Sequence, residues 1–184
     1  SDAAWCKSSI DCREKGLCSA GASGCVADEA GCKSALSCKE RGECAAVGDR
    51  CVATRLGCKQ SLVCETAGSC ALDNTLAGRQ CVATARGCRR SSACNSEGRC
   101  GFSGGKCVTT IPGCRKSVRC KQDGLCGSGD GYFEQSCVAT KAGCSNASAC
   151  AERGLCVLGQ EANEGCRAND KGCQKSLACQ ALKK

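Results

Sequence analysis

The segment CVATRLGCKQSLVCETAGSC, residues 51–70, contains four cysteines and two glycines at positions that recur along the whole chain. Its first cysteine has counterparts whose successive spacings are 26, 30, 26, 30 and 29 residues. A fixed period of this length indicates a tandem-repeat protein. The counterparts are Cys25, Cys51, Cys81, Cys107, Cys137 and Cys166. We predict one array with units at 1–24, 25–50, 51–80, 81–106, 107–136, 137–165 and 166–184.

The residue pattern of each unit predicts one short helix between two capping residues. A residue that suits a helix N-cap stands four positions before the second cysteine. These residues are Asp2, Asp28, Thr54, Thr84, Thr110, Thr140 and Asn169. A glycine two positions before the last cysteine provides a left-handed stop. These glycines are Gly16, Gly42, Gly68, Gly98, Gly124 and Gly154. The expected helix is about thirteen residues long.

Two further positions of the repeat predict close packing. The residue midway between the two helical cysteines is always Ser or Ala, as at Ser61 and Ala35. A glycine precedes the second cysteine, as at Gly57, except that Trp5 stands there in the first copy. Glycine inside a helix costs up to about 1 kcal/mol, so we expect backbone to pack against it.

Cysteine replaces the usual core residues. The 184-residue chain has 26 cysteines, no histidine and no methionine, and its aromatic residues are Trp5, Phe102, Tyr132 and Phe133. Metal-thiolate sites draw on CxC or CxxC pairs, and the sequence has neither. We therefore predict disulfides, no metal and no cofactor. The expected fold is all-α and disulfide-rich, an elongated array of seven short helices with disulfide-closed linkers and no conventional hydrophobic core.

The sequence leaves the disulfide connectivity open. Residues six apart on one helix diverge by about 120°, so Cys58 is not expected to pair with Cys64. Each helix would then offer its two cysteines to two neighbouring helices. The simplest scheme for the remaining cysteines closes each linker on itself. It pairs Cys18 with Cys25, Cys44 with Cys51, Cys70 with Cys81, Cys100 with Cys107, Cys126 with Cys137 and Cys156 with Cys166.

Neighbour pairing of seven helices leaves one helical cysteine at each end. The leftover pair is Cys12 with Cys173, or Cys6 with Cys179, depending on the sense of pairing. These cysteines would close a ring, bond irregularly near the termini or link neighbouring molecules. We predict the last, a head-to-tail polymer that continues the internal helix contact.

Composition predicts an oxidising location. Disulfide-dense chains belong outside the cell, on its surface or in a periplasm. No stretch approaches the length of a membrane span, and the opening SDAAWC is consistent with an exported chain whose signal peptide has been removed. The net charge is +8, with basic and acidic residues interleaved. An anionic surface polymer is therefore a possible partner, whereas no specific nucleic acid is predicted.

Residues for catalysis are missing from the sequence. A chain without histidine has no Ser-His-Asp or Cys-His arrangement, so we expect no enzyme. Basic residues after the second cysteine recur once per helix and form either a solvated face or an anion-binding stripe. They are Lys7, Lys33, Lys59, Arg89, Arg90, Arg115 and Lys116. Tyr132 and Phe133, on the glycine-rich linker GSGDGYFEQS, form a candidate contact loop.

The repeated pattern GC-x-x-S-x-x-C-x-x-x-G-x-C resembles tandem cysteine-rich repeats in exported and surface proteins of bacteria, particularly myxobacterial ones. The resemblance implies a location and carries over no functional residues. We expect an extracellular structural protein, a subunit of a disulfide-stabilised filament or surface layer. The alternatives are a cell-surface adhesion or binding module that recognises a polymer or protein, and a secreted toxin or inhibitor.

Overall fold

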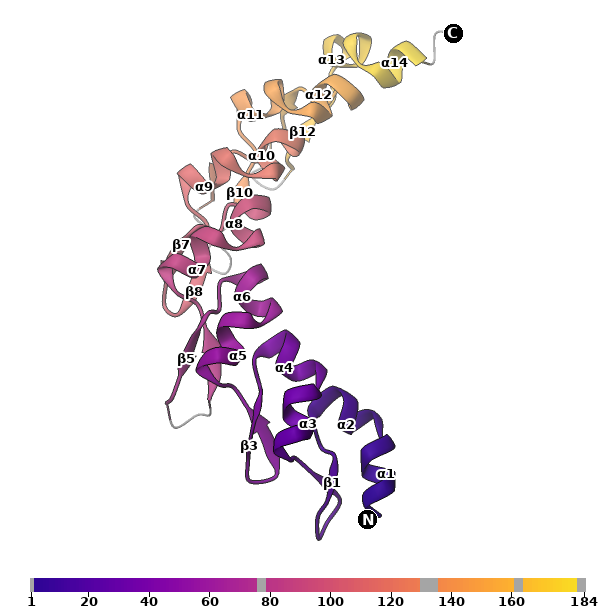
Figure 1. Cartoon of the computed structure of the whole chain (residues 1–184). Helices are drawn as coiled ribbons and strands as arrows, with labels where there is room; N and C mark the ends of the chain where they lie inside the picture. The colour runs from indigo at the N-terminus through magenta and orange to yellow at the C-terminus, as the bar shows by residue number, and fades with distance from the viewer. Residues whose placement is uncertain (1, 76–78, 130–135, 161–163, 182–184) are drawn as a thin grey trace. The chain divides into compact units, whose positions relative to one another are not determined.

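The computed structural model describes residues 2–75, 79–129, 136–160 and 164–181, apart from the Cys179 side chain. The chain divides into two compact units. Figure 1 shows the helices and strands that follow one another along it. The first unit comprises Ser1–Ser91 with Gly104–Lys106, and the second comprises Ser92–Ser103 with Cys107–Lys184. The same local architecture recurs in both.

Two short helices, not one, form the helical part of each repeat. The first helices are α1 (Ala3–Ser8), α3 (Glu29–Ser34), α5 (Arg55–Gln60), α7 (Ala85–Arg90), α9 (Ile111–Lys116), α11 (Lys141–Asn146) and α13 (Asp170–Lys175). The second helices are α2 (Ile10–Lys15), α4 (Leu36–Arg41), α6 (Leu62–Ala67), α8 (Ser92–Glu97), α10 (Val118–Asp123), α12 (Ser148–Arg153) and α14 (Leu177–Ala181). The prediction of one longer helix per repeat was therefore wrong.

The helices break at the small residue between the two helical cysteines. At Ser117 the backbone is extended, with φ −66° and ψ 157°. The Ser117 hydroxyl donates to the Cys114 carbonyl at 2.8 Å and accepts from the Cys120 N–H at 3.1 Å, so it serves both helix ends. Ala35 breaks the helix in the same conformation without a hydroxyl. Packing therefore imposes the break, and both residues are fully buried.

A β-hairpin follows each pair of helices up to α12, which corrects the expected all-α class. The paired strands are β1 (Ser19–Ala20) with β2 (Cys25–Val26), β3 (Ala45–Val47) with β4 (Arg50–Val52), β5 (Ala71–Asp73) with β6 (Gln80–Val82), β7 (Gly101–Ser103) with β8 (Lys106–Val108), β9 (Gly127–Ser128) with β10 (Cys137–Val138), and β11 (Val157–Leu158) with β12 (Cys166–Arg167). The linkers and the C-V-A-T segments supply these strands. Leu72, for example, pairs with Cys81 in antiparallel register.

Two nested disulfides close each repeat. The inner disulfide joins cysteines six positions apart: Cys12–Cys18, Cys38–Cys44, Cys64–Cys70, Cys94–Cys100, Cys120–Cys126 and Cys150–Cys156. The outer disulfide joins cysteines 19 to 23 positions apart: Cys6–Cys25, Cys32–Cys51, Cys58–Cys81, Cys114–Cys137 and Cys144–Cys166. Cys88, Cys107 and Cys173 are also disulfide-bonded.

This pairing overturns the predicted linker disulfides. The six linker pairs do not form: Cys18–Cys25, Cys44–Cys51, Cys70–Cys81, Cys100–Cys107, Cys126–Cys137 and Cys156–Cys166. Gly68, at φ 73°, turns the chain back so that Cys70 reaches the Cys64 in α6, with 4.5 Å between their Cα atoms. The prediction that Cys58 does not pair with Cys64 is confirmed, but the prediction that they bond to neighbouring helices is wrong, because Cys58 bonds to Cys81 of β6 and Cys64 bonds to Cys70.

The predicted covalent polymer also loses its basis. Cys6 is bonded to Cys25 and Cys12 to Cys18, within the chain. Cys173 is disulfide-bonded as well, and the Cys179 side chain lies outside the described residues. No described cysteine is a free thiol.

The core is built from cysteine and small residues, as predicted. The buried apolar residues of the described chain are all cysteines and alanines. The buried polar residues are serines and one threonine. The cysteine of each first helix from α1 to α11, such as Cys58, is fully buried. A covalent sulfur bridge thus occupies the place that a large aliphatic side chain takes in an ordinary core.

Successive repeats touch through glycine backbone. The Gly42 carbonyl, at the end of α4, accepts hydrogen bonds from Cys44 N–H and from Thr54 N–H of the next repeat, both at 3.0 Å. A Cβ on Gly57 would overlap that same carbonyl oxygen. The predicted approach of backbone to this helical glycine is confirmed.

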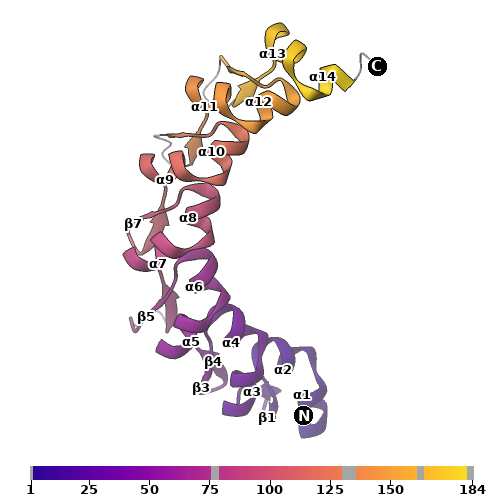
Figure 2. The same ribbon diagram turned by 45° about the horizontal axis from the view of Figure 1, so that its top comes forward.

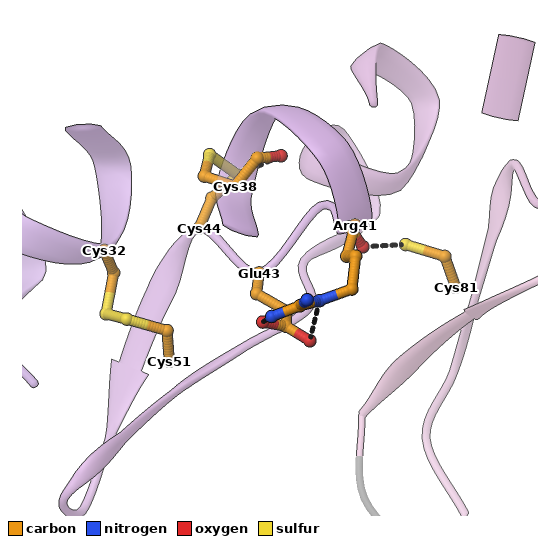
Figure 3. Close-up of polar contacts among 7 residues, drawn as sticks. All are labelled: Cys32, Cys38, Arg41, Glu43, Cys44, Cys51 and Cys81. Atoms are coloured by element: carbon orange, nitrogen blue, oxygen red, sulfur yellow. Dashed lines mark hydrogen bonds and ion pairs between the residues drawn. A yellow bond between two sulfur atoms is a disulfide. The ribbon is translucent and has the colours of Figure 1, made fainter. Parts of the chain in front are cut away.

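Disulfides and hairpins add to the contact between repeats. The Cys81 sulfur lies 3.0 Å from the Arg41 carbonyl oxygen of the preceding repeat, beside the Arg41–Glu43 ion pair (Figure 3). Ala53 N–H donates to the Arg79 carbonyl of the following hairpin. Within each unit the second helices consequently stand side by side, α2, α4 and α6 in one and α8, α10 and α12 in the other (Figure 2).

Trp5 replaces, in α1, the glycine through which the other repeats contact the repeat before them. It occupies the position at which the other first helices carry glycine, and 61% of its surface is exposed. The predicted head-to-tail continuation of the internal contact therefore has no support at this helix.

We predict that Gly57→Ala destabilises the chain. Helix propensity alone predicts that the free energy of unfolding rises by up to about 1 kcal/mol, whereas overlap with the Gly42 carbonyl predicts that it falls by about 1–3 kcal/mol. Unfolding in guanidinium chloride measures whether the substitution raises or lowers the free energy of unfolding. Leu56→Ala is the control, because Leu56 precedes Gly57 on α5 and is 64% exposed. Stabilisation by Gly57→Ala would refute the close contact.

The outer disulfide should stabilise a repeat more than the inner one. The chain-entropy relation gives about 3.4 kcal/mol for the loop closed by Cys58–Cys81 and about 2.4 kcal/mol for that closed by Cys64–Cys70. Replacing Cys58 with Ala also removes a buried sulfur. We expect Cys58→Ala/Cys81→Ala to lower the unfolding free energy more than Cys64→Ala/Cys70→Ala. Equal losses in denaturant titrations would contradict this ranking.

Candidate binding grooves between repeats

A groove of about 690 Å³ lies in the first unit, between the repeat of α5 and α6 and the next first helix, α7. The inner disulfide Cys64–Cys70 and Leu72 of β5 line it with apolar atoms. Thr84 and Gly87, which make the contact between the repeats, also line it. The groove is thus a direct product of how one repeat packs on the next.

Basic side chains dominate the charge of this first groove. Arg55 and Lys59 are four residues apart on α5, and Arg86 and Arg90 are four apart on α7. Side chains at this spacing lie on one face of a helix, so each pair faces the groove together. Glu65 is the one acidic residue in the lining. Within the described residues, none of the four basic side chains forms an ion pair.

A second groove, of about 710 Å³, occupies the same place two repeats further on, in the second unit. Its lining contains Ile111, Arg115, Ala142 and Asn146 at the positions of Arg55, Lys59, Arg86 and Arg90, respectively. Lys121 takes the position of Glu65. The two grooves therefore have similar volumes and equivalent linings, but the first has four cations and one acidic residue where the second has Arg115 and Lys121 alone.

The repeat before the first groove neutralises the equivalent positions. Glu29 and Lys33 stand where the next repeat has Arg55 and Lys59, and they form an ion pair at 3.1 Å. The Ala46 backbone N–H donates to Glu29 at 3.2 Å. This hydrogen bond, followed by Lys33, holds the pKa of Glu29 below its ordinary value. The same two positions thus carry either a compensated pair or two uncompensated cations.

The residues of the predicted basic stripe lie in different surroundings. Lys59 and Arg90 line the first groove and Arg115 lines the second. Lys33 is paired with Glu29. Arg55 and Arg86 were not among the predicted basic residues, although each stands four residues before a basic residue on the same helix. That i,i+4 spacing was the signal that could have found them.

Tyr132 and Phe133, the predicted contact loop, lie outside the described residues. Within the part of the chain that the structure describes, no three His, Cys, Asp or Glu residues are placed so that they could hold a metal ion. None of its helices has the length and apolar character needed to cross a membrane. Comparison with protein-family models, curated proteins and solved structures finds no match to this chain.

We expect Lys33→Gln to raise the pKa of Glu29 part of the way to its ordinary value. The Ala46 hydrogen bond remains in the variant and continues to favour the carboxylate. Because folding lowers the pKa of Glu29, its carboxylate stabilises the folded state at pH values above the ordinary, unfolded-state pKa. This stabilisation is lost as the pH falls through the pKa of the folded state. Carboxyl NMR titration of both proteins measures the shift. An unchanged Glu29 pKa would contradict the ion pair.

Proposed function

We propose that this chain is an extracellular, non-catalytic binding module whose grooves between repeats receive a polymer or protein of the cell surface. The observation that carries the proposal is the recurrence of one groove, at one position of the repeat, in both units. Repeat proteins commonly use the surface between stacked units to bind partners. No catalytic arrangement is required for this role.

The residues of the grooves divide into frame and variable positions. Frame positions are identical in the two grooves: for example, Cys64 matches Cys120 and Gly87 matches Gly143. Variable positions differ in charge and size, as Arg86 differs from Ala142. A purely structural repeat needs only the frame. Variation in charge and size among the side chains that line the cavity supports recognition as the use of that cavity.

The disulfides support an extracellular place of action. All described cysteines are disulfide-bonded, which belongs to an oxidising compartment. Stability that comes from covalent bridges and not from a large apolar core suits a protein that acts outside the cell. Export of the chain is part of the proposal.

A filament-forming role has less support. The cysteines expected to link molecules, Cys6 and Cys12, are bonded within the chain, and α1 has Trp5 in place of the glycine of the internal contact. The toxin or inhibitor alternative rested on the loop of Tyr132 and Phe133, which the structure does not describe. The binding role is the one supported by groove geometry.

The test is binding of the native chain to immobilised neutral polysaccharides, anionic polysaccharides and extracellular matrix proteins, followed by biolayer interferometry. We expect saturable binding to at least one class, and its loss after reduction and alkylation, because the grooves depend on the inner disulfides. Light scattering without ligand monitors self-assembly. Failure to bind any class, or binding that survives reduction, would refute the proposal.

A further inference from the structure

We propose that the first-unit groove binds a segment of an anionic polysaccharide, with Arg55, Lys59, Arg86 and Arg90 contacting its sulfate or carboxylate groups. This inference rests on the proposed binding function and assigns it a site and a ligand class. It is carried by the charge, shape and lining of one groove and by comparison with its counterpart in the second unit.

The positive charge of the groove favours the binding of an anion. Four cations from two helices line one cavity with only Glu65 as a counter-charge. Like charges in a shared concave site repel one another and attract anions to it. Within the described residues the four side chains have no ion-pair partner. A bound polyanion would supply the missing compensation.

The fold does not require these cations. At three of the four positions the second groove has Ile111, Ala142 and Asn146, and the helices, caps and disulfides around it are the same. Packing of the repeats therefore does not explain Arg55, Arg86 and Arg90. Their shared position around one cavity favours a ligand-binding role.

The lining also suits a sugar chain. Arginine binds sulfate and carboxylate through two parallel N–H donors, and three of the four cations are arginines. Leu72 and the Cys64–Cys70 disulfide offer apolar surface to the C–H face of a pyranose ring. Glu65 can accept a hydrogen bond from a sugar hydroxyl.

Other polyanions fit the groove less well. Single-stranded nucleic acid gains affinity by stacking bases on aromatic side chains, and the groove lining contains none. An extended acidic peptide gains affinity by pairing with a strand edge, and β5 is only three residues long. The groove thus favours a ligand recognised by its charges and its ring faces.

The test compares the whole chain with a variant that carries the residues of the second groove, Arg55→Ile/Arg86→Ala/Arg90→Asn. The probes are dextran sulfate, polygalacturonate and neutral dextran. We expect the wild type to bind dextran sulfate or polygalacturonate and not dextran. The variant should bind about tenfold more weakly, with a shallower dependence of affinity on salt, because three charge contacts are lost.

A control variant removes the same charge elsewhere in the first unit. Arg50→Gln/Arg79→Gln/Lys106→Gln replaces three exposed cations near the hairpins, none of which lines either groove. It should retain affinity to within about threefold. Equal weakening by both variants would show that net charge, and not the groove, binds the polymer, and would overturn the site.

The reciprocal variant Ile111→Arg/Ala142→Arg/Asn146→Arg keeps the test decisive even if the first variant folds poorly. Introducing the cations into the second groove should raise affinity for the sulfated or carboxylated probe by severalfold. No gain would count against the site. Tighter binding of polyglutamate or single-stranded DNA than of either anionic polysaccharide would overturn the ligand class. Binding of a neutral polymer or a protein that the charge-removing variant retains would refute this inference and leave the proposed function standing.

Discussion

Contact between the glycine that caps the second helix of one repeat and the glycine in the first helix of the next is the constraint on which this structure depends. The Gly42 carbonyl accepts from Thr54 N–H, and Gly57 lies directly against the same oxygen. Any side chain at Gly57 would separate the two backbones. Because α4 ends and α5 begins at this point, the contact sets the spacing of the repeats, and the grooves follow from that spacing.

Nested disulfides make so close an approach stable without large apolar side chains. Cys58–Cys81 holds the first helix to the end of the hairpin, and Cys64–Cys70 fastens the turn at Gly68. Both bonds lie within one repeat, counted from Thr54 to the residue before Thr84. Each repeat is therefore closed covalently, whereas neighbouring repeats are joined through backbone hydrogen bonds and packing.

Because disulfides close each repeat and backbone contacts join the repeats, residues on the surface can vary without loss of the fold. Caps, glycines and cysteines build the frame, so positions such as Arg55 and Arg86 contribute little to it. Their equivalents in the other groove, Ile111 and Ala142, show that the frame accepts quite different side chains there. A scaffold with a covalently fixed core and variable grooves is suited to recognition, and the basic groove is its most specialised surface.

The sequence alone determined the repeat, the helix caps at Thr54 and Gly68, the disulfide-based core and the close approach at Gly57, because each depends on local chemistry that recurs at a fixed period. Tertiary structure alone decided the break at Ser61, the hairpins and the disulfide partners. The break persists where alanine replaces serine, so packing determines it and no local signal reveals it. Disulfide pairing depends on the turn at Gly68, which brings Cys70 back to α6. The grouping of Arg55 with Arg86 depends on the distance between two repeats. The linear sequence contains neither piece of information.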